Sequence, residues 1–325
     1  MDRVSVTVVI VTFNRKLQLA KLLNALQEST VKPENIVLID NASQDGTSEY
    51  LESRYEERKK IDPVDDLSEK VASALCWIGT EKEPSIHYYQ LAENIGGAGG
   101  FSLGQQIALS DKTEFIWLMD DDGQPTAECL EELVSYLRGH PDVGILNPLV
   151  VDIAAPELLA FGLPGGIKSV QNAFDASERQ FLNDMANPFN GTLIRTKVVN
   201  AIGLVKAELF IWGDETEYME RAKLNKIEFG TYVAAKFWHP KSKTSYQKRF
   251  FNVFTIEKKP LHLEMNVYRN QGYLVKKYGS IWSFRKIFKR IIISLLSMKW
   301  FEAYMIAIYY IDGYTERFKL PNIRK

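Results

Sequence analysis

The sequence is short of the features that mark secreted or membrane-spanning proteins. It has only two cysteines in 325 residues, Cys76 and Cys129, which are too few for a disulfide framework and suit a reducing cytoplasm. No uninterrupted apolar stretch is long enough to span a bilayer, and the first residues lack the pattern of a signal peptide. A net charge of −1 argues against bulk nucleic-acid binding. We therefore expect a cytoplasmic protein that does not bind nucleic acid.

Short apolar strands alternate with amphipathic helices in the first part of the chain. Residues 4–11 and 36–39 have the β-branched, apolar composition of buried strands, and four leucines between residues 19 and 26 lie at one-face helical spacing. This β-α-β-α order predicts an α/β fold with a mostly parallel sheet flanked by helices. Ligands of such sheets bind at the carboxyl ends of the strands.

Three adjacent carboxylates stand at the end of one predicted strand. Residues 115–119 form an apolar run, and Asp120, Asp121 and Asp122 follow it directly. Unpaired charge is costly to bury, so these acids should emerge at the carboxyl end of the strand. Carboxylates select hard cations such as Mg²⁺ or Mn²⁺, and a cation would relieve the repulsion between them. The alternative is a solvated acidic turn.

Two further polar turns end strands of the same predicted sheet. Asp40 could accept a hydrogen bond from a ribose or a base edge, or it could only cap its turn. Asn94 precedes a glycine-rich segment that includes Gly96 and Gly97. Glycines let the backbone approach a ligand, and a helix that starts there could direct its free amides at a phosphate. A tight strand–helix turn is the alternative.

A second acidic site follows aromatic residues near position 212. Trp212 and Gly213 precede Asp214 and Glu215, in what the pattern predicts to be the first turn of a helix. A carboxylate in a partly apolar site is a candidate general base. Acids in a first helical turn also stabilise the helix dipole, which is the structural alternative.

A histidine ends the strand that begins near Ile227. Imidazole binds manganese well beside carboxylates, so His239 is a candidate metal ligand, although a structural role is the alternative. The segment that follows is a basic loop that contains Lys248 and Arg249. Such a loop suits a diphosphate or is only a solvated loop.

Composition also suggests how the chain is divided. We expect a catalytic domain over residues 1–250, with a charged, partly helical surface insertion at 52–84, and a helical region over residues 251–325. Residues 152–187 are rich in Gly, Ala and Pro and predict an irregular, acceptor-side lid.

One helix of the C-terminal region is basic and amphipathic. Its expected apolar face contains Phe284, Ile287, Phe288, Ile291, Leu295 and Met298, with basic residues opposite. This pattern suits the surface of an anionic membrane. The alternative is packing on the main fold or on another subunit, so a homo-oligomer stays open.

The motifs together resemble those of family 2 of the inverting glycosyltransferases, which have a GT-A, Rossmann-like fold. They occur in the family's order at residues 12–15, 40–47, 120–122, 189–191 and 212–215, within a resemblance that covers residues 4–245. The loop at 94–101, with Trp238 and His239, looks most like bacterial galactofuranosyltransferases. Rhamnosyltransferases of polysaccharide assembly share much of the pattern.

This resemblance implies a nucleotide-sugar donor and a divalent metal, Mn²⁺ or Mg²⁺. Thr12, Arg15 and Asp40 would hold the uridine, Asp120 would lie near the ribose or metal, and Asp122 and His239 would bind the metal. Glu215 would deprotonate the acceptor, with Asp214 as the alternative because the family usually has aspartate at this position. The remaining donor-site candidates are Asn14, Asn94, Gly96, Gly97 and Asp121. The acceptor or diphosphate candidates are Trp212, Asn190, Gly191, Lys248 and Arg249.

The resemblance therefore implies an enzyme that adds galactofuranose from UDP-galactofuranose to a surface polysaccharide or a lipid-linked glycan. We expect it to act at the inner face of the cell membrane as a peripheral protein. A rhamnosyltransferase that uses dTDP-rhamnose is the alternative within the class. A non-catalytic nucleotide-sugar-binding scaffold at the membrane is the alternative outside it, and a nucleotidyltransferase ranks last.

Overall fold

The computed structural model describes residues 3–55, 59–60, 71–77, 84–241 and 245–318. The chain divides into two compact units, Met1–Val205 with Arg221–Lys241, and Lys206–Glu220 with Ser242–Lys325. The segment Lys206–Glu220 thus belongs with the C-terminal unit, although it lies well before residue 250 in the sequence. Compact units are not folding domains, so the predicted division at residue 250 stays a prediction.

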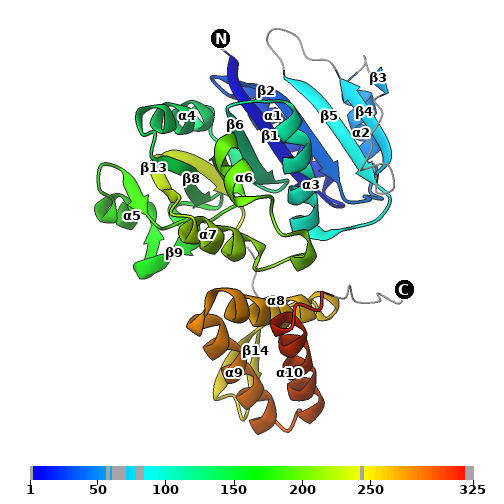
Figure 1. Ribbon diagram of the computed structural model, residues 1–325, viewed down its shortest axis with the longest axis vertical. Helices are drawn as coiled ribbons and strands as arrows, with labels where there is room; N and C mark the ends of the chain where they lie inside the picture. Colours follow the sequence, from blue (N-terminus) through cyan, green and yellow to red (C-terminus); the bar gives the residue numbers. More distant parts are fainter. Residues whose placement is uncertain (1–2, 56–58, 61–70, 78–83, 242–244, 319–325) are drawn as a thin grey trace. The chain divides into compact units, whose positions relative to one another are not determined.

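The first unit is built on one mixed sheet (Figure 1). Its strands run in the order β10-β9-β8-β12-β6-β1-β2-β5-β4-β3, and β13 pairs with β7, β8 and β11. The central strands β5, β2, β1 and β6 are parallel, whereas β12 runs antiparallel to both β6 and β8. The strands are β1 (Arg3–Thr12), β2 (Lys32–Asp40), β3 (Lys59–Lys60), β4 (Val71–Trp77), β5 (Ser85–Leu91), β6 (Phe115–Asp120), β7 (Gln124–Pro125), β8 (Val143–Asp152), β9 (Ala155–Leu163), β10 (Ile167–Ser169), β11 (Phe181–Asn183), β12 (Asn190–Arg195) and β13 (Glu228–His239).

Helices cover both faces of this sheet, as the predicted α/β fold requires. The helices of the first unit are α1 (Lys16–Glu28), α2 (Thr47–Arg54), α3 (Gly96–Ser110), α4 (Cys129–Gly139), α5 (Val170–Ala176) and α6 (Thr196–Ile202). Helix α7 (Asp214–Leu224) begins in the second unit and ends in the first, which also contains the 3₁₀ turn η2 (Pro164–Gly166).

Strand β1 shows how its sequence builds the two layers. Side chains alternate between the faces of a strand, and Val8 and Ile10 enter the core that α1 and α4 complete. Val9 and Val11 meet α3 on the opposite face. Helix α3 approaches this face closely through glycine, because a Cβ on Gly104 would lie 2.2 Å from Cγ1 of Val9 and one on Gly100 would lie 2.6 Å from Cγ1 of Val11.

Two segments are more regular than the sequence predicted. Residues 152–187, predicted to be an irregular lid, contain β9, β10, α5 and β11. Their Leu159, Leu163, Ile167 and Leu182 are buried in a small core that they share with β8 and β13. The expectation of a structureless loop is therefore wrong. In the expected insertion at 52–84, the described residues include β4, which extends the sheet antiparallel to β5 and buries Trp77.

The second unit is mainly helical. It contains a 3₁₀ turn, η3 (Ala207–Leu209), a hairpin of β14 (Ser245–Arg249) and β15 (Phe254–Lys258), and helices α8 (Leu261–Tyr278), α9 (Ile281–Leu296) and α10 (Trp300–Tyr314). The expected C-terminal helical region is therefore present. Helices α8 and α10 cross closely, since a Cβ on Gly272 would lie 2.1 Å from the carbonyl oxygen of Tyr310. No helix within the described ranges is long and apolar enough to cross a membrane.

The predicted apolar face of α9 is divided in the structure. Ile287 is buried with Tyr268 and Ile306 in the core of the second unit, whereas Phe284 and Phe288 are exposed. Helix α9 thus has one apolar face turned inward and another turned to solvent. The sequence pattern predicted a single apolar face, because the residues of both faces repeat at helical spacing.

The close packing of α3 predicts that Gly104→Ala destabilises the protein. The added methyl group meets the fully buried Val9, and overpacking of a core typically costs about 1–3 kcal/mol. The better helix propensity of alanine offsets about 1 kcal/mol of this. Chemical denaturation should show a lower free energy of unfolding. The matched control is Gly139→Ala at the end of α4, where a Cβ meets nothing within 4 Å, and equal stability of the two variants would contradict the prediction.

Candidate active site

Asp121 connects the acidic triplet to the loop after β1. Its side chain is buried, and its Oδ2 accepts a hydrogen bond from Thr12 Oγ1 at 2.6 Å and a longer one from the Phe13 amide at 3.4 Å. Its Oδ1 lies 3.1 Å from Nη1 of Arg15. Thr12 and Arg15, two donor-site candidates, are therefore held against the triplet.

Arg15 joins Asp121 to Asp122, because the same Nη1 lies 2.6 Å from Oδ2 of Asp122. Burial opposes the charge of Arg15, but Asp121, Asp122 and Asp120 together raise the pKa of Arg15 above its ordinary value. Burial raises the pKa of Asp121 to about 6 despite Arg15 and Thr12. The Arg15 side chain stays 47% exposed, so part of this cation faces solvent beside the acids.

Asp122 and His239 form a pair that fits a divalent cation. His239 Nδ1 lies 2.8 Å from the carbonyl oxygen of Pro240, so Nδ1 carries the hydrogen when the ring is neutral. Nε2 then presents a lone pair to Oδ1 of Asp122, 2.9 Å away. Two electron-rich atoms at this distance need a proton or a cation between them.

The pair supplies one carboxylate and one imidazole, both ligands for Mn²⁺. No group of three or more His, Cys, Asp or Glu side chains suited to a metal occurs within the described part of the chain. Two protein ligands are nevertheless a common number where substrate phosphates complete the coordination of a hard cation. Burial would raise the pKa of Asp122, but the hydrogen bond and charge of His239 when its ring is protonated, together with the charge of Arg15, lower this pKa below the ordinary value.

The third acid, Asp120, ends β6 and is half-buried. Its amide donates to the carbonyl oxygen of Phe189 at 3.1 Å, which links β6 to the segment at 189–191. Its charge acts on Arg15, so the three acids and one arginine form a single electrostatic group.

Asp40 is fully buried, and both of its carboxylate oxygens bind within the protein. Oδ1 accepts from the Ser43 amide at 2.8 Å, and Oδ2 accepts from the Tyr88 hydroxyl at 2.7 Å. These contacts account for Asp40 as a turn cap. Its role toward the uridine stays a prediction, and because Asp40 is 0% exposed, a nucleotide could reach it only after a local rearrangement.

The neighbouring Asn41, which the sequence analysis did not single out, ties β2 to the glycine-rich loop. Its amide nitrogen Nδ2 donates to the carbonyl oxygen of Gly96 at 3.2 Å, and its Oδ1 accepts from the Ile95 amide at 3.3 Å.

The loops after β1 and β2 are bonded to each other. The Asn14 amide donates to Ser43 Oγ at 2.8 Å, and Asn14 Oδ1 accepts from the Gln44 amide at 2.7 Å. Asn14 has a φ of 53°, a left-handed conformation that asparagine tolerates. Asn14 therefore joins the two loops, and its contact with the sugar donor stays a prediction.

The glycine-rich segment begins α3, as predicted. Asn94 Oδ1 accepts from the Gly96 amide at 2.8 Å, and Gly96 has a φ of 79°. A Cβ on Gly97 would meet nothing within 4 Å, so the backbone there is accessible to a ligand. Gly99 and Gly100 instead have packing roles, because a Cβ on either would crowd Ile95 or Val11.

The segment at 189–191 packs against β6 and β13. Asn190 Nδ2 donates to the Pro188 carbonyl at 3.0 Å, and the Gly191 carbonyl accepts from Trp117 Nε1 at 2.8 Å. Gly191 has a φ of 79°, and a Cβ there would lie 2.7 Å from Cδ2 of Phe237. Both residues thus have structural roles, and their contact with an acceptor stays a prediction.

The second acidic site lies in the second unit, at the start of α7. Asp214 and Glu217 are buried, and Glu217 Oε1 accepts from the Tyr278 hydroxyl at 2.5 Å. Glu215 is partly exposed, and its Oε2 accepts from the Gly213 amide over a long 3.2 Å. Of the two candidate bases, Glu215 is the more accessible.

Asn270 on α8 shapes the loop that leads to these acids. Its Nδ2 lies within hydrogen-bond distance of the carbonyl oxygens of Leu209, Ile211 and Trp212, at 2.8, 3.0 and 2.8 Å. The loop is strained, because Phe210 and Trp212 have φ values of 64° and 61°. The Trp212 ring also lies 4.8 Å from Nζ of Lys259. No local sequence signal predicts Asn270, which lies 58 residues beyond Trp212.

Lys248 and Arg249 lie on strand β14 and not in a loop. Lys248 is exposed, whereas Arg249 is 9% exposed and pairs with Glu302 at 3.0 Å. Arg249 therefore has a structural partner within the second unit. The structure brings together Thr12, Arg15, Asp120, Asp121, Asp122 and His239 in the first unit, and Trp212, Asp214 and Glu215 in the second.

Comparisons with known proteins agree with this architecture. The model of the family described as "Glycosyl transferase family 2" matches residues 7–156. The galactofuranosyltransferase GlfT1 of Mycolicibacterium smegmatis is 29% identical over 84% of this chain and 84% of its own length. GlfT1 of Mycobacterium tuberculosis is also 29% identical, over 85% of this chain and 83% of its own.

Solved structures of low identity share the fold. The crystal structure of S. aureus TarS 1-349 has a TM-score of 0.50 at 14% identity and covers 96% of this chain and 72% of that one. A second S. aureus TarS structure has a TM-score of 0.52 at 14% identity, over 90% of this chain but only 43% of that chain.

The fold and these matches define the class of the protein, which is a glycosyltransferase with a GT-A fold. Residues 7–156 match the model of glycosyltransferase family 2 and the chain is similar to galactofuranosyltransferases, so the resemblance inferred from its motifs is confirmed.

The contacts of Asn270 predict that Asn270→Ala impairs catalysis more than folding. The variant leaves three loop carbonyls without this donor, and a buried acceptor left unsatisfied costs about 1–3 kcal/mol. We expect turnover to fall roughly tenfold or more, as that energy implies, because the loop that carries Asp214 and Glu215 relaxes. Asn225→Ala, which removes an exposed side-chain bond to the Arg221 carbonyl, is the control. Unchanged turnover in Asn270→Ala would contradict the positioning role.

Proposed function

We propose that this protein transfers galactofuranose from UDP-galactofuranose to a glycan or a lipid-linked acceptor, with inversion at the anomeric carbon. Similarity to enzymes named galactofuranosyltransferase over more than four fifths of both chains supports the sugar. The observation that carries the proposal is the Asp122–His239 pair beside Arg15, which suits a diphosphate leaving group.

The first unit would bind the donor at the carboxyl ends of β1, β2 and β6. A Mn²⁺ or Mg²⁺ ion held by Asp122 and His239 would supply Lewis-acid stabilisation of the departing diphosphate. Arg15 is half-exposed and lies beside the same carboxylate, so its guanidinium can also pair with a phosphate. The accessible backbone at Gly97, in the first turn of α3, provides amides that favour an anion.

Deprotonation of the acceptor hydroxyl would fall to the second acidic site. Direct inversion needs one base that reaches the acceptor. Glu215 is partly exposed and, within the part of the chain that the structure describes, accepts only the long bond from the Gly213 amide, whereas Asp214 is 4% exposed. These observations favour Glu215 as the base, with Asp214 as the alternative.

Donor binding should depend on the metal pair. Calorimetric titration of UDP into the wild type should show binding that Mn²⁺ strengthens, and Asp122→Ala should weaken it roughly tenfold or more because a cation ligand is lost. Asp142→Ala, which removes an exposed acid in the turn before β8, is the control and should bind as the wild type does.

Parallel titrations separate the alternatives. Preference for dTDP over UDP would turn the donor assignment to dTDP-rhamnose. Donor binding without turnover of UDP-galactofuranose on any lipid-linked acceptor would favour a binding scaffold. No nucleotide binding in the presence of Mn²⁺ would overturn the donor site.

The base should be identified by neutral isosteres. Glu215→Gln should lower kcat on the order of 10²–10⁴-fold, the range for loss of a general base, and should leave UDP binding intact. Glu208→Gln, an exposed acid of the same unit, is the control. A large loss in Asp214→Asn with little effect in Glu215→Gln would reverse the assignment.

A further inference from the structure

Helix α9 presents a continuous apolar stripe to solvent. Its exposed members are spaced three or four residues apart and so lie along one face; they are Ile281, Phe284, Phe288, Ile292 and Leu295. The rings of Phe284 and Phe288 stack with centroids 6.0 Å apart. A sixteen-residue helix is about 24 Å long, so the stripe is a large unpartnered surface.

The stripe continues into the turn between α9 and α10. Six large apolar side chains are exposed there within ten residues: Leu295, Leu296, Met298, Trp300, Phe301 and Tyr304. Trp300 is 66% exposed and Phe301 is 76% exposed. Monomeric soluble proteins rarely expose apolar patches of more than a few hundred Å², and larger ones mark interaction sites.

Positive charge accompanies this apolar surface. Helix α9 carries Arg285, Lys286, Lys289 and Arg290 and has no acidic residue, although the whole chain has a net charge of −1. Arg290 pairs with Glu264 at 2.8 Å. Arg285 and Lys289 make no ion pair within the described part of the chain, so their charge is available to a partner.

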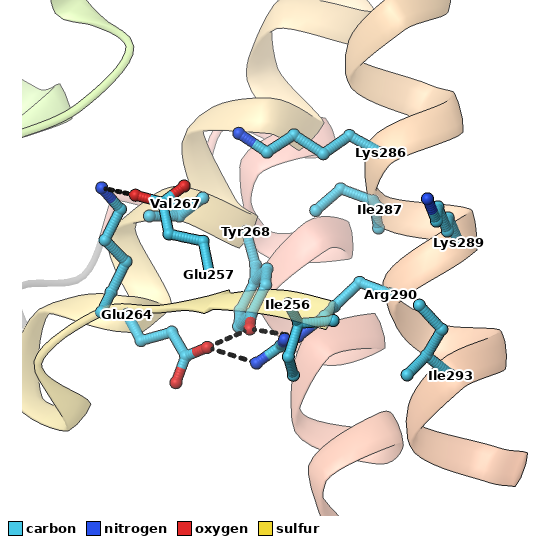
Figure 2. Close-up of a pocket in the computed structure, with 11 residues that line it drawn as sticks. Ile256, Glu257, Glu264, Val267, Tyr268, Lys286, Ile287, Lys289, Arg290 and Ile293 are labelled. Carbon is cyan, nitrogen blue, oxygen red and sulfur yellow. Dashed lines mark hydrogen bonds and ion pairs between the residues drawn. The ribbon is translucent and has the colours of Figure 1, made fainter. Parts of the chain in front are cut away.

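A pocket lies beside the same basic residues, between α9, α8 and β15 (Figure 2). It has a volume of about 150 Å³ and an apolar lining that includes Ile256, Val267 and Ile293. The acids Glu257 and Glu264 are already paired, with Lys259 and Arg290 respectively.

The charges around this pocket do not balance. Lys286 and Lys289 make no ion pair within the described part of the chain, and Figure 2 shows none for either of them. The Nζ of Lys286 lies 4.8 Å from the centroid of the Trp282 ring, a contact that leaves the positive charge unneutralised. The lining thus has two more basic than acidic side chains, beside an apolar wall. An anionic group with an apolar tail matches both properties.

We propose that the α9–α10 surface docks on an anionic phospholipid bilayer. The exposed aromatic and aliphatic side chains would enter the boundary between headgroups and acyl chains, and Lys286 and Lys289 would contact lipid phosphates at the mouth of the pocket. The positive charge of this surface favours an anionic bilayer over a second copy of the protein, because a second copy of this helix would present the same basic residues and no acids to pair with them. This surface shares no residue with the candidate donor site, and the proposal does not depend on the proposed sugar.

The test is co-sedimentation of the full-length protein with vesicles. Phosphatidylglycerol mixed with phosphatidylcholine should bind the wild type, and phosphatidylcholine alone should bind it much more weakly. Phe288→Ser combined with Trp300→Ser should reduce binding roughly tenfold or more, because two exposed apolar side chains no longer enter the bilayer. Lys286→Gln combined with Lys289→Gln should reduce binding to the anionic vesicles about fivefold for each lysine.

The matched control is Phe174→Ser on α5, which removes an exposed aromatic from the first unit. Thermal unfolding checks that each variant is folded. Equal binding to the two kinds of vesicle, or wild-type binding by the Phe288–Trp300 variant, would overturn the proposal. So would self-association of the wild type on gel filtration that the same variant abolishes, because a second copy would then be the occupant.

Discussion

The buried carboxylate of Asp121 is the constraint on which the candidate donor site depends. An acid with so little exposure must be bonded on every side, and it is bonded to Thr12, to the Phe13 amide and to Arg15. These bonds hold the loop after β1 against the end of β6. Arg15 is thereby placed on Asp122, which in turn faces His239 from β13. Three strands distant in the sequence thus contribute to one group of charges.

The sequence predicted this part of the fold because its signals are local. Each element is predicted by a pattern within its own residues. These patterns are the β-branched runs of β1 and β2, the leucine spacing of α1 and the apolar run of β6 before Asp120. Parallel strands then bring their carboxyl ends to one edge, so the candidates after β1 and β6 meet. Asn270 and Tyr88 were missed because their hydrogen bonds join segments separated by tens of residues.

The segments that were misread had weak or ambiguous patterns. Strand β9 lacks a regular alternation of buried and exposed residues, so residues 152–187 looked irregular. Helix α9 has the opposite problem, because Ile287 and Phe288 are both apolar at helical spacing but face inward and outward. Amphipathic periodicity predicts that a helix has apolar faces. Which of these faces is buried is decided by packing against α8 and α10.

The last residues of β13 restrict how the chain length can vary. From Lys236 to His239, β13 pairs residue for residue with β8, and β7 pairs with it at Phe237 and Trp238. Burial alternates here, with Phe237 and His239 covered and Lys236 and Trp238 partly open. A single inserted residue would reverse the parity of the strand and direct His239 away from Asp122. Two inserted residues would keep the face but move His239 about 6–7 Å along the strand, away from Asp122. Relatives that keep the pair must therefore keep the length of this stretch, or absorb a change of length in a bulge before Lys236.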